Sequence, residues 1–454
     1  MAYTVEFSAP TIYNLSRLME ALKQKFADKA LALYKELRSI TKEHGETIVD
    51  QVALRQVLGG ARGIKMMLWE TSQLDPNKGI RFRGYSIPEI KEQLPSGPQG
   101  EPKPEGLFWL MLTGEIPTAE EVDGLTKEWQ RRAEVPQQVF TTLDSMPADT
   151  HPMTQFTIAI MAMQSDSVFS HRYAEGMPKS DYWDAVYEDS MNLIARLPRV
   201  AAYIYRRTFK DGDHIEPDTS LDYSANFAHM LGSDDEDFRS LMRLYLTIHA
   251  DHEGGNASAH TVNLVGSTLS DPYLAFAAGM NALAGPLHGL ANQEVIKWIF
   301  EMIDNLGTET PTEEQIADYV QQTLDEGKVI PGYGHAVLRE PDPRFTAQRR
   351  FAEQYIKDSD LISTVWKIFD VVPPILQSLG KVKNPWPNVD AHSGALLVHY
   401  GFKEFSYYTV LFGVSRALGV LAAGIWSRAL GMPLERPKSV TSEWVKAQVN
   451  TKTK

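Results

Sequence analysis

The stretch TVLFGVSRALGVLAAGIWS, residues 409–427, decides which kind of protein this is. Its apolar character raises the question of a membrane span, which needs about 18 or more consecutive apolar residues. Arg416 divides the run, and neither half approaches that length. A charged side chain inside an apolar helix is expensive in lipid and is normally accommodated by a partner inside a protein. The stretch therefore predicts a buried core helix in which Arg416 is, by default, the partner in a buried ion pair.

Helical patterns dominate the rest of the chain as well. From Asn14 to about His44, apolar residues recur every three or four positions with Lys and Glu between them. The pair Asp271-Pro272 is typical of an N-cap followed by proline at the first helical position, and residues 233–236 (SDDE) are typical of a capping box at Ser233. Strand signals are weak, and residues 79–84 (GIRFRG) could form at most a hairpin. These patterns predict an all-α protein.

Composition and charge exclude several classes of function. The chain has 454 residues, enough to bury a large core and to divide into two or three domains. Its net charge of −13 makes it a poor candidate for binding nucleic acid or an anionic membrane. The absence of cysteine excludes disulfides, cysteine-bound metals and thiol nucleophiles. No GxGxxG motif, Walker loop or alternation of strands and helices supports nucleotide chemistry.

Histidine and aspartate occur in segments punctuated by glycine, asparagine or proline. Such loops let the backbone approach a ligand closely, and catalytic groups often project from them. An isolated histidine near glycine is nevertheless more often a hydrogen-bonded structural residue. Structural and catalytic roles therefore both stay open on pattern alone. The segments are HADHEGGN (249–256), AGPLHGLANQE (284–294), PGYGHAVLR (331–339) and KNPWPNVDAHSG (383–394), the last containing Asp390.

A metal site is the first alternative for these histidines. Residues 249–253 read HADHE, which resembles a zinc motif on first inspection. A zinc protease motif needs H-E-x-x-H, and its inverted form needs H-x-x-E-H, so this order matches neither. We therefore predict that the chain binds no metal.

Several long motifs, taken in order, resemble one family. They are GIRFRGYSIPEI, LTIHADHEGGNASAHT, GPLHGLANQE, PGYGHAVLREPDPRF, KNPWPNVDAHSG and VLFGVSRALGVLA, and they lie between roughly residues 45 and 440. They resemble citrate synthase, in the longer eukaryotic-type branch that some bacteria also carry. The resemblance implies an all-α, two-domain fold. Residues 1–289 and 403–454 would form a large domain, and residues 290–402 a small mobile one.

The resemblance also implies an activity, the condensation of acetyl-CoA with oxaloacetate followed by hydrolysis of citryl-CoA to citrate and CoA. Removing a proton from a thioester methyl group requires a base and a hydrogen-bond donor for the developing enolate oxygen. By matching position, Asp390 is the base and His288 is that donor. His335 matches the residue that polarises the oxaloacetate ketone and protonates the new alkoxide.

Oxaloacetate carries two carboxylates, which planar arginine side chains recognise well. The family positions for this clamp are matched by Arg344, Arg416 and Arg436, with His252 and His335 as further contacts. In the family the residue at position 436 is supplied by the other subunit. The resemblance therefore implies a homodimer with shared sites.

Coenzyme A would be a substrate and product, and no other cofactor is expected. The stretch FSHRYAEG departs from the family pattern FARAYAEG, so either His171 or Arg172 could contact a CoA phosphate. The other candidate contacts with CoA are Arg62, Leu287, Val329, Gly332, Tyr333, Gly334, Arg339, Lys381, Lys383 and Asn388.

Two other functions stay open at this point. A 2-methylcitrate synthase would use propionyl-CoA through the same residues, since one methylene is worth only about 1–3 kcal/mol of discrimination. A non-catalytic homologue that only binds metabolites would be expected to lack part of the catalytic set. The start MAYTVEFSAP shows neither a secretory signal nor an Arg-rich transit peptide. We therefore expect a bacterial cytoplasmic protein, with the mitochondrial matrix as the alternative if the chain is a processed form.

Overall fold

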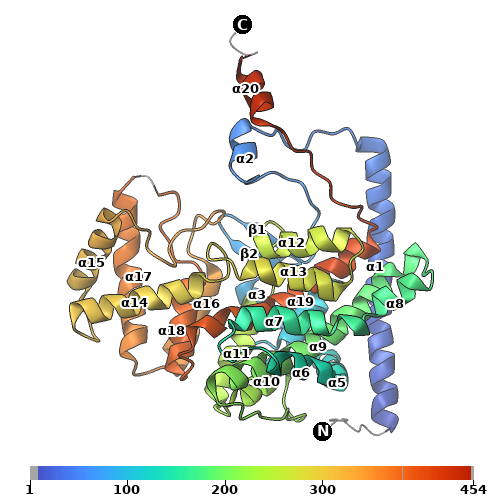
Figure 1. The fold of residues 1–454 in the computed structure, drawn as a ribbon, viewed down its shortest axis with the longest axis horizontal. Helices are drawn as coiled ribbons and strands as arrows, with labels where there is room; N and C mark the ends of the chain where they lie inside the picture. Colours follow the sequence, from blue (N-terminus) through green and yellow to red (C-terminus); the bar gives the residue numbers. More distant parts are fainter. Residues whose placement is uncertain (1–8, 381, 451–454) are drawn as a thin grey trace.

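The computed structural model describes residues 9–380 and 382–450, and it is built almost wholly from α-helices (Figure 1). The first helices are α1 (Ala9–His44), α2 (Leu54–Leu58), α3 (Ile87–Gln93), α4 (Pro104–Thr113), α5 (Ala119–Arg132), α6 (Gln137–Asp144), α7 (Pro152–Ala162), α8 (Val168–Ala174), α9 (Tyr182–Phe209) and α10 (Tyr223–Leu231). The remainder are α11 (Glu236–Ile248), α12 (Ala257–Ser267), α13 (Pro272–Leu283), α14 (Ala291–Leu306), α15 (Glu313–Asp325), α16 (Pro343–Tyr355), α17 (Asp360–Ser378), α18 (Asp390–His399), α19 (Tyr408–Ala429) and α20 (Ser442–Asn450). Short 3₁₀ turns are η1 (Gln164–Asp166), η2 (Lys179–Asp181) and η3 (Phe405–Tyr407).

Helix α19, which contains most of the stretch at 409–427, lies at the centre of the larger part of the molecule (Figure 1). By length and composition the segment Phe405–Ala429 could cross a membrane, yet 89% of its most apolar window is buried inside the protein. It packs along α9 and also contacts α4, α11, α12 and α13. Ser415 donates a hydrogen bond to the Leu246 carbonyl, and the Gly419 amide bonds the Ala250 carbonyl. The prediction of a buried core helix is confirmed.

The local helix signals were mostly right. Helix α1 covers the segment predicted from Asn14 to His44, and Asp271 caps α13 through the amide of Leu274. The capping box predicted at Ser233 is wrong. Helix α11 begins at Glu236, and its cap is Asp235, whose carboxylate accepts from the amides of residues 237 and 238. Asp235 stands directly before the helix, so its carboxylate can accept from the first free amides of α11. The neighbouring Asp234 instead binds His229 and Arg239.

The only sheet in the described chain is small. Strand β1 (Ser72–Asp75) pairs antiparallel with β2 (Gly79–Phe82), and β2 pairs with the two-residue β3 (Tyr85–Ser86). The hairpin expected at 79–84 therefore exists, and it gains a third strand. The sheet helps to position the loop after α11, because side chains at residues 69, 71 and 72 donate hydrogen bonds to Asp251 in that loop.

Helices α14, α15, α17 and α18 lie together at one side of the molecule, to the left in Figure 1. They pack on one another, with α16 against α18, and their contacts with the central helix α19 are fewer. This arrangement is compatible with a separate small domain. The predicted boundaries at residues 290 and 402 stay a prediction.

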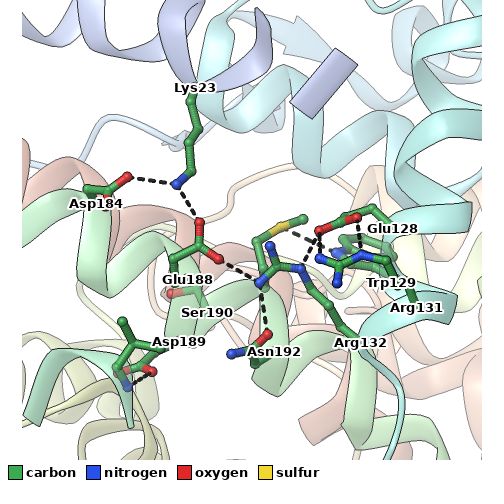
Figure 2. A network of polar contacts seen from close by, with 12 residues as sticks. Lys23, Glu128, Trp129, Arg131, Arg132, Asp184, Glu188, Asp189, Ser190 and Asn192 are labelled. Carbon is green, nitrogen blue, oxygen red and sulfur yellow. Dashed lines mark hydrogen bonds and ion pairs between the residues drawn. The ribbon is translucent and has the colours of Figure 1, made fainter. Parts of the chain in front are cut away.

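A network of ion pairs joins α1, α5 and α9 (Figure 2). Lys23 of α1 reaches both Asp184 and Glu188 of α9. Arg132 of α5 lies 2.7 Å from Glu188 and 2.5 Å from Glu128. Every charge in this network has an opposite charge in contact, so the network fixes the long N-terminal helix onto the core.

Candidate active site

Six of the predicted side chains converge where α11, α12, α16, α18 and α19 meet. The imidazole rings of His252 and His335 lie 5.3 Å apart, edge to face. The charges of Arg344 and Arg416 both act on the carboxyl group of Asp390, and Arg416 also acts on His288. Residues far apart in sequence therefore form one buried polar cluster.

His335 is held by its own loop in a defined tautomer. Its Nδ1 atom accepts hydrogen bonds of 3.0 Å from the amides of both Val337 and Leu338. A nitrogen that accepts two amide protons carries none itself, so the ring proton is on Nε2. Burial lowers the pKa of His335 to about 4, and the nearby Arg344 guanidinium adds to this. His335 is therefore a neutral donor through Nε2 at physiological pH.

The loop around His335 is fixed against the start of α18. Tyr333 forms an antiparallel bridge with Pro387, and the Gly334 amide bonds the Trp386 carbonyl at 2.9 Å. A Cβ on Gly332, whose φ is +81°, would lie 3.0 Å from the Ala391 Cα. Only glycine fits both the backbone angle and this close approach. These contacts set His335 and Asp390 at a fixed distance from each other.

His288 carries the opposite tautomer. It lies between α13 and α14, and its Nε2 accepts from the Ser258 amide at 3.2 Å and faces the Ser258 hydroxyl at 2.8 Å. The amide belongs to the first turn of α12, where unpaired N–H groups favour a neutral acceptor over a cation. Burial lowers the pKa of His288 to about 4, and the charge of Arg416 contributes. The ring proton is therefore on Nδ1, which is free of hydrogen bonds to the described residues.

Asp390 begins α18 and is half-buried. Its backbone amide bonds the side-chain oxygen of Asn388, whose amide group in turn donates to the Gly334 carbonyl. Burial raises the pKa of Asp390 to about 6, although the charges of Arg344 and Arg416 oppose the rise. A carboxylate with a pKa just below neutral is ionised at pH 7 and is a stronger base than an ordinary aspartate.

Arg344 is buried and already oriented by one carboxylate. Asp342 accepts from its Nε at 3.0 Å and from its Nη2 at 2.6 Å. The same carboxylate accepts the amide of Arg344 and so caps α16. Two parallel bonds fix the plane of a guanidinium, and here they leave Nη1 for another anion.

Arg416 is also buried, but neutral groups hold it. Its Nε donates to the His249 carbonyl at 3.1 Å and its Nη1 to the Asn256 side chain at 3.2 Å. Burial without a direct ion pair lowers the pKa of Arg416 to about 10. The default expectation of a buried ion pair at Arg416 is wrong, because its hydrogen-bond partners among the described residues are a carbonyl and an amide.

Two histidines leave a ring nitrogen unmatched. The Nε2 atoms of His249 and His252 are buried without a hydrogen-bond partner among the described residues. Burial lowers the pKa of both imidazoles, to about 3 for His249. An unpaired buried polar atom is costly unless a ligand satisfies it, so these nitrogens are available to a ligand bound in the cluster.

The sequence analysis gave no specific role to four residues that build this site, although His249 and Asn256 lie in the segment 249–256 that it singled out. The four are His249, Asn256, Ser258 and Asp342. Asp342 had a readable signal, because Asp before Pro343 is typical of a helix N-cap. The roles of the other three depend on contacts made only in the folded chain.

Arg436 does not join the cluster within this chain. It is exposed, and it follows Glu435, which binds His260 and Asn263 of α12. These contacts hold the segment after α19 along α12. The guanidinium of Arg436 is then presented to solvent.

The predicted CoA contacts divide into two groups. Gly332, Tyr333, Gly334 and Asn388 lie at the site, where they hold the loop of His335 as described above. The others lie at the surface or outside the described residues. Leu287 and Val329 are exposed, as are Arg62 and Lys383, whereas Lys381 lies outside the described residues.

Arg339, Arg172 and His171 are the remaining candidates for contact with CoA. Arg339 donates to carbonyls of its own loop, at 2.8 Å for Val337 and 2.7 Å for Leu338. Arg172 pairs with Asp184 at 2.7 Å, and a ring nitrogen of His171 lies 2.9 Å from a backbone carbonyl. Arg172 and His171 do not join the cluster within one chain, whereas the charge of Arg339 acts on His335. Their role in CoA binding stays a prediction.

Metal ligation was the alternative for the histidine segments. Within residues 9–380 and 382–450, no three His, Asp or Glu side chains are grouped so that they could hold a metal ion. The expectation of a reaction without metal or added cofactor stays a prediction.

Comparisons with known proteins identify the family. The family described as "Citrate synthase, C-terminal domain" matches residues 60–438. The mitochondrial citrate synthase of Daucus carota is 55% identical over 444 residues, which cover 98% of this chain and 92% of that protein. Mitochondrial citrate synthase 4 of Arabidopsis thaliana is 58% identical over 412 residues, covering 90% of this chain and 87% of that protein.

Solved structures agree on the fold. The crystal structure of citrate synthase from Pyrobaculum aerophilum superimposes with a TM-score of 0.74 at 26% identity, covering 85% of this chain and 92% of that one. Citrate synthase from Thermoplasma acidophilum, solved as a ternary complex with carboxymethyl coenzyme A and oxaloacetate, has a TM-score of 0.70 at 24% identity. It covers 84% of this chain and 95% of that one. The predicted all-α fold of this family is confirmed.

The expected compartment is wrong. The similar proteins from Daucus carota, Arabidopsis thaliana and Citrus maxima, and the fish enzyme of Xiphias gladius, are all named mitochondrial. These names point away from a bacterial cytoplasm. Composition and motif order did not detect this, because the catalytic residues are set by the reaction and not by the compartment.

From the family match and the 53–58% identity of relatives over most of its length, the chain belongs to the citrate synthase family and is an acyltransferase of the citrate synthase type.

Proposed function

We propose that Asp390, His288 and His335 carry the citrate synthase reaction of this chain. Asp390 takes a proton from the methyl group of acetyl-CoA. The Nδ1–H of His288 donates to the developing enolate oxygen, and the enolate carbon attacks the ketone carbon of oxaloacetate. The Nε2–H of His335 protonates the new alkoxide, and the proton held by Asp390 restores the neutral imidazole. Water then hydrolyses citryl-CoA to citrate and CoA.

The observation that carries this proposal is the pair of opposite tautomers around one carboxylate. His335 uses Nδ1 to accept and His288 uses Nε2 to accept, so each offers one N–H to a reacting oxygen. Neutral imidazoles donate without leaving a strong competing base at the site. The raised pKa of Asp390 suits a group that must abstract a proton from carbon.

Oxaloacetate recognition is assigned to Arg344, Arg416 and His252. The free Nη1 of Arg344 and the loosely held guanidinium of Arg416 supply positive charge from two sides. The unpaired Nε2 of His252 supports a further contact. A dianion would compensate the burial of both guanidinium groups.

Arg436 is assigned to the site of a second copy in a homodimer. The exposed state of Arg436 supports this, as do the exposed apolar side chains on the segments nearest the termini, such as Ile48, Leu58, Leu434 and Trp444. Helices α2 and α20 both extend beyond the main body in Figure 1. Extensions of this kind are stable when another subunit covers them.

Mixing two inactive variants tests the shared site. Asp390→Asn and Arg436→Ala subunits, denatured and refolded together, form a hybrid with one intact site. Activity well above either parent is expected. Activity no higher than the parents would contradict a site shared between subunits.

The remaining assignments rest on the family. Residues 290–402 would close onto the rest of the chain when oxaloacetate binds. This closure would bring His335 and Asp390 toward His288 and Arg416 and exclude water.

The phosphates of CoA would be bound by Arg62, Arg339, Lys381 and Lys383. The mitochondrial matrix is the proposed compartment.

Substrate preference is tested by comparing kcat/KM for acetyl-CoA and propionyl-CoA in the presence of oxaloacetate. Acetyl-CoA should be preferred by at least about tenfold, as expected for discrimination of one methylene. Equal values, or a preference for propionyl-CoA, would replace the assignment by 2-methylcitrate synthase.

A further inference from the structure

We infer that Asp251, a residue outside the catalytic set, is a positioning residue for oxaloacetate. It fixes the loop that carries His252, and it holds a negative charge beside Arg416. This inference rests on the proposed oxaloacetate clamp.

Asp251 is completely buried and joins two distant parts of the chain. Its Oδ2 atom accepts from the Trp69 indole at 3.0 Å, from the Ser72 hydroxyl at 2.8 Å and from the Thr71 hydroxyl. Its Oδ1 atom accepts the backbone amide of His252 at 2.9 Å. The carboxylate thus ties the start of the small sheet to the residue that contacts substrate.

A second contact continues the tie. The backbone amide of Glu253 donates to the Ser72 hydroxyl at 2.9 Å, and Glu253 has a φ of +54°. A non-glycine residue in this left-handed region is strained, and surrounding contacts must hold it. Asp251 and Ser72 are those contacts, and they force the sharp turn directly after His252.

Helix α19 closes over the same carboxylate. A Cβ on Gly419 would lie 2.5 Å from the Asp251 Cβ, so only glycine permits this approach. Gly419 lies one turn after Arg416, and its amide bonds the Ala250 carbonyl at 3.2 Å. The helix that carries Arg416 is therefore packed directly onto Asp251.

All four hydrogen-bond donors to Asp251 are uncharged, so its negative charge is not consumed by a direct ion pair. Burial lowers the pKa of Arg416; Asp251 opposes this most strongly, Asp390 opposes it too, and Arg344 adds to it. Asp251 thus stabilises the cationic form of Arg416 while leaving its N–H groups to other acceptors. Uncharged acceptors could also hold residues 69–72, so the negative charge of Asp251 is not needed for that structural role alone.

Asp189 of α9 provides a matched control, and it lies in the region of Figure 2. It is also completely buried, and it accepts from the Ser167 hydroxyl at 2.7 Å and from two amides at 2.6 and 3.1 Å. It anchors the start of α8, and no residue of the cluster contacts it. Replacing Asp189 by Asn should reproduce the structural cost of losing a buried carboxylate without its effect on substrate.

The experiment compares Asp251→Asn with Asp189→Asn in the full chain. For Asp251→Asn, the KM and the calorimetric Kd for oxaloacetate should rise by about tenfold or more, as expected on loss of a charge-assisted contact. The KM for acetyl-CoA at saturating oxaloacetate should change less than about twofold, because a remote carboxylate does not touch CoA. Asp189→Asn should lower Tm and leave the oxaloacetate KM unchanged.

Unchanged oxaloacetate KM and Kd in Asp251→Asn, with a lowered Tm, would overturn the inference and leave Asp251 a structural anchor. If Asp251→Asn does not fold, Ser72→Ala decides. A rise of about threefold or more in the oxaloacetate Kd is then expected from loss of the two hydrogen bonds of the Ser72 hydroxyl, and no change would overturn the inference. A wild-type enzyme that fails to bind oxaloacetate would instead refute the proposed function.

Discussion

Two polar clusters of this protein treat their charges differently. In the network of Figure 2, Glu128 pairs with Arg131 and Arg132, and Arg132 also pairs with Glu188. In the active site, imidazole nitrogens are left unmatched, and Arg416 has only neutral partners. Paired charges hold helices together, whereas unpaired ones are available to a substrate.

The protonation of two carboxyl groups shows the consequence. Burial alone would raise the pKa of Glu128, but hydrogen bonds from Arg131 and the adjacent charge of Arg132 reverse the effect and lower it. Burial raises the pKa of Asp390 to about 6, because its arginines act only from a distance. The same burial therefore gives a permanent anion in one cluster and a base in the other.

The largest expected effect follows from removing the base. Asp390→Asn should lower kcat by about a thousandfold, within the range for loss of a general base. Its Tm should stay close to that of the wild type, because the side-chain oxygens of Asp390 make no hydrogen bond with the described residues. The measurement is steady-state citrate formation together with thermal denaturation. Near-normal condensation would show that the base is another residue.

A smaller effect is expected from the clamp. Arg344→Gln should raise the oxaloacetate KM by about a hundredfold, since it removes a bidentate cation and leaves Asp342 buried without its partner. The KM for acetyl-CoA at saturating oxaloacetate serves as the control. If both constants rose equally, Arg344 would act on the fold and not on the dianion.

Acidification should lower the rate through Asp390. Because burial raises its pKa to about 6, the carboxylate is ionised above that pH and becomes protonated below it. The kcat/KM for acetyl-CoA should therefore fall about tenfold for each unit of pH between 6 and 5 and level off above pH 7, while His288 and His335 stay mostly neutral over this range. A flat kcat/KM between pH 5 and 7 would exclude this titration.

The network of Figure 2 should respond only in stability. Arg132→Met removes the cation that Glu128 and Glu188 share, but Arg131 and Lys23 still pair with them. The loss of these charge-assisted bonds should cost about 1–3 kcal/mol of unfolding free energy. Urea denaturation measures this loss. The kcat and both KM values should remain within about twofold of the wild type, because ion pairs this remote do not touch substrate. A large fall in kcat would show that the two clusters are coupled.

Much of this division was readable in the sequence. The split apolar run at 409–427 predicted the buried helix with Arg416, and the ordered motifs predicted His288, His335 and Asp390 together. The tautomers were not readable, since they depend on the amides of Val337, Leu338 and Ser258. Nor was the role of Asp251, whose partners lie about 180 positions away. Local signals select elements, but convergence of distant residues appears only in the fold.

The central claim is that two neutral histidines of opposite tautomer flank one carboxylate base. Nitrogen-15 NMR of histidine-labelled enzyme at pH 7, with single His288 and His335 substitutions to assign the signals, measures this directly. We expect the spectra to show a proton on Nε2 of His335 and on Nδ1 of His288, with both rings neutral. An imidazolium at either position, or the same tautomer at both, would contradict it.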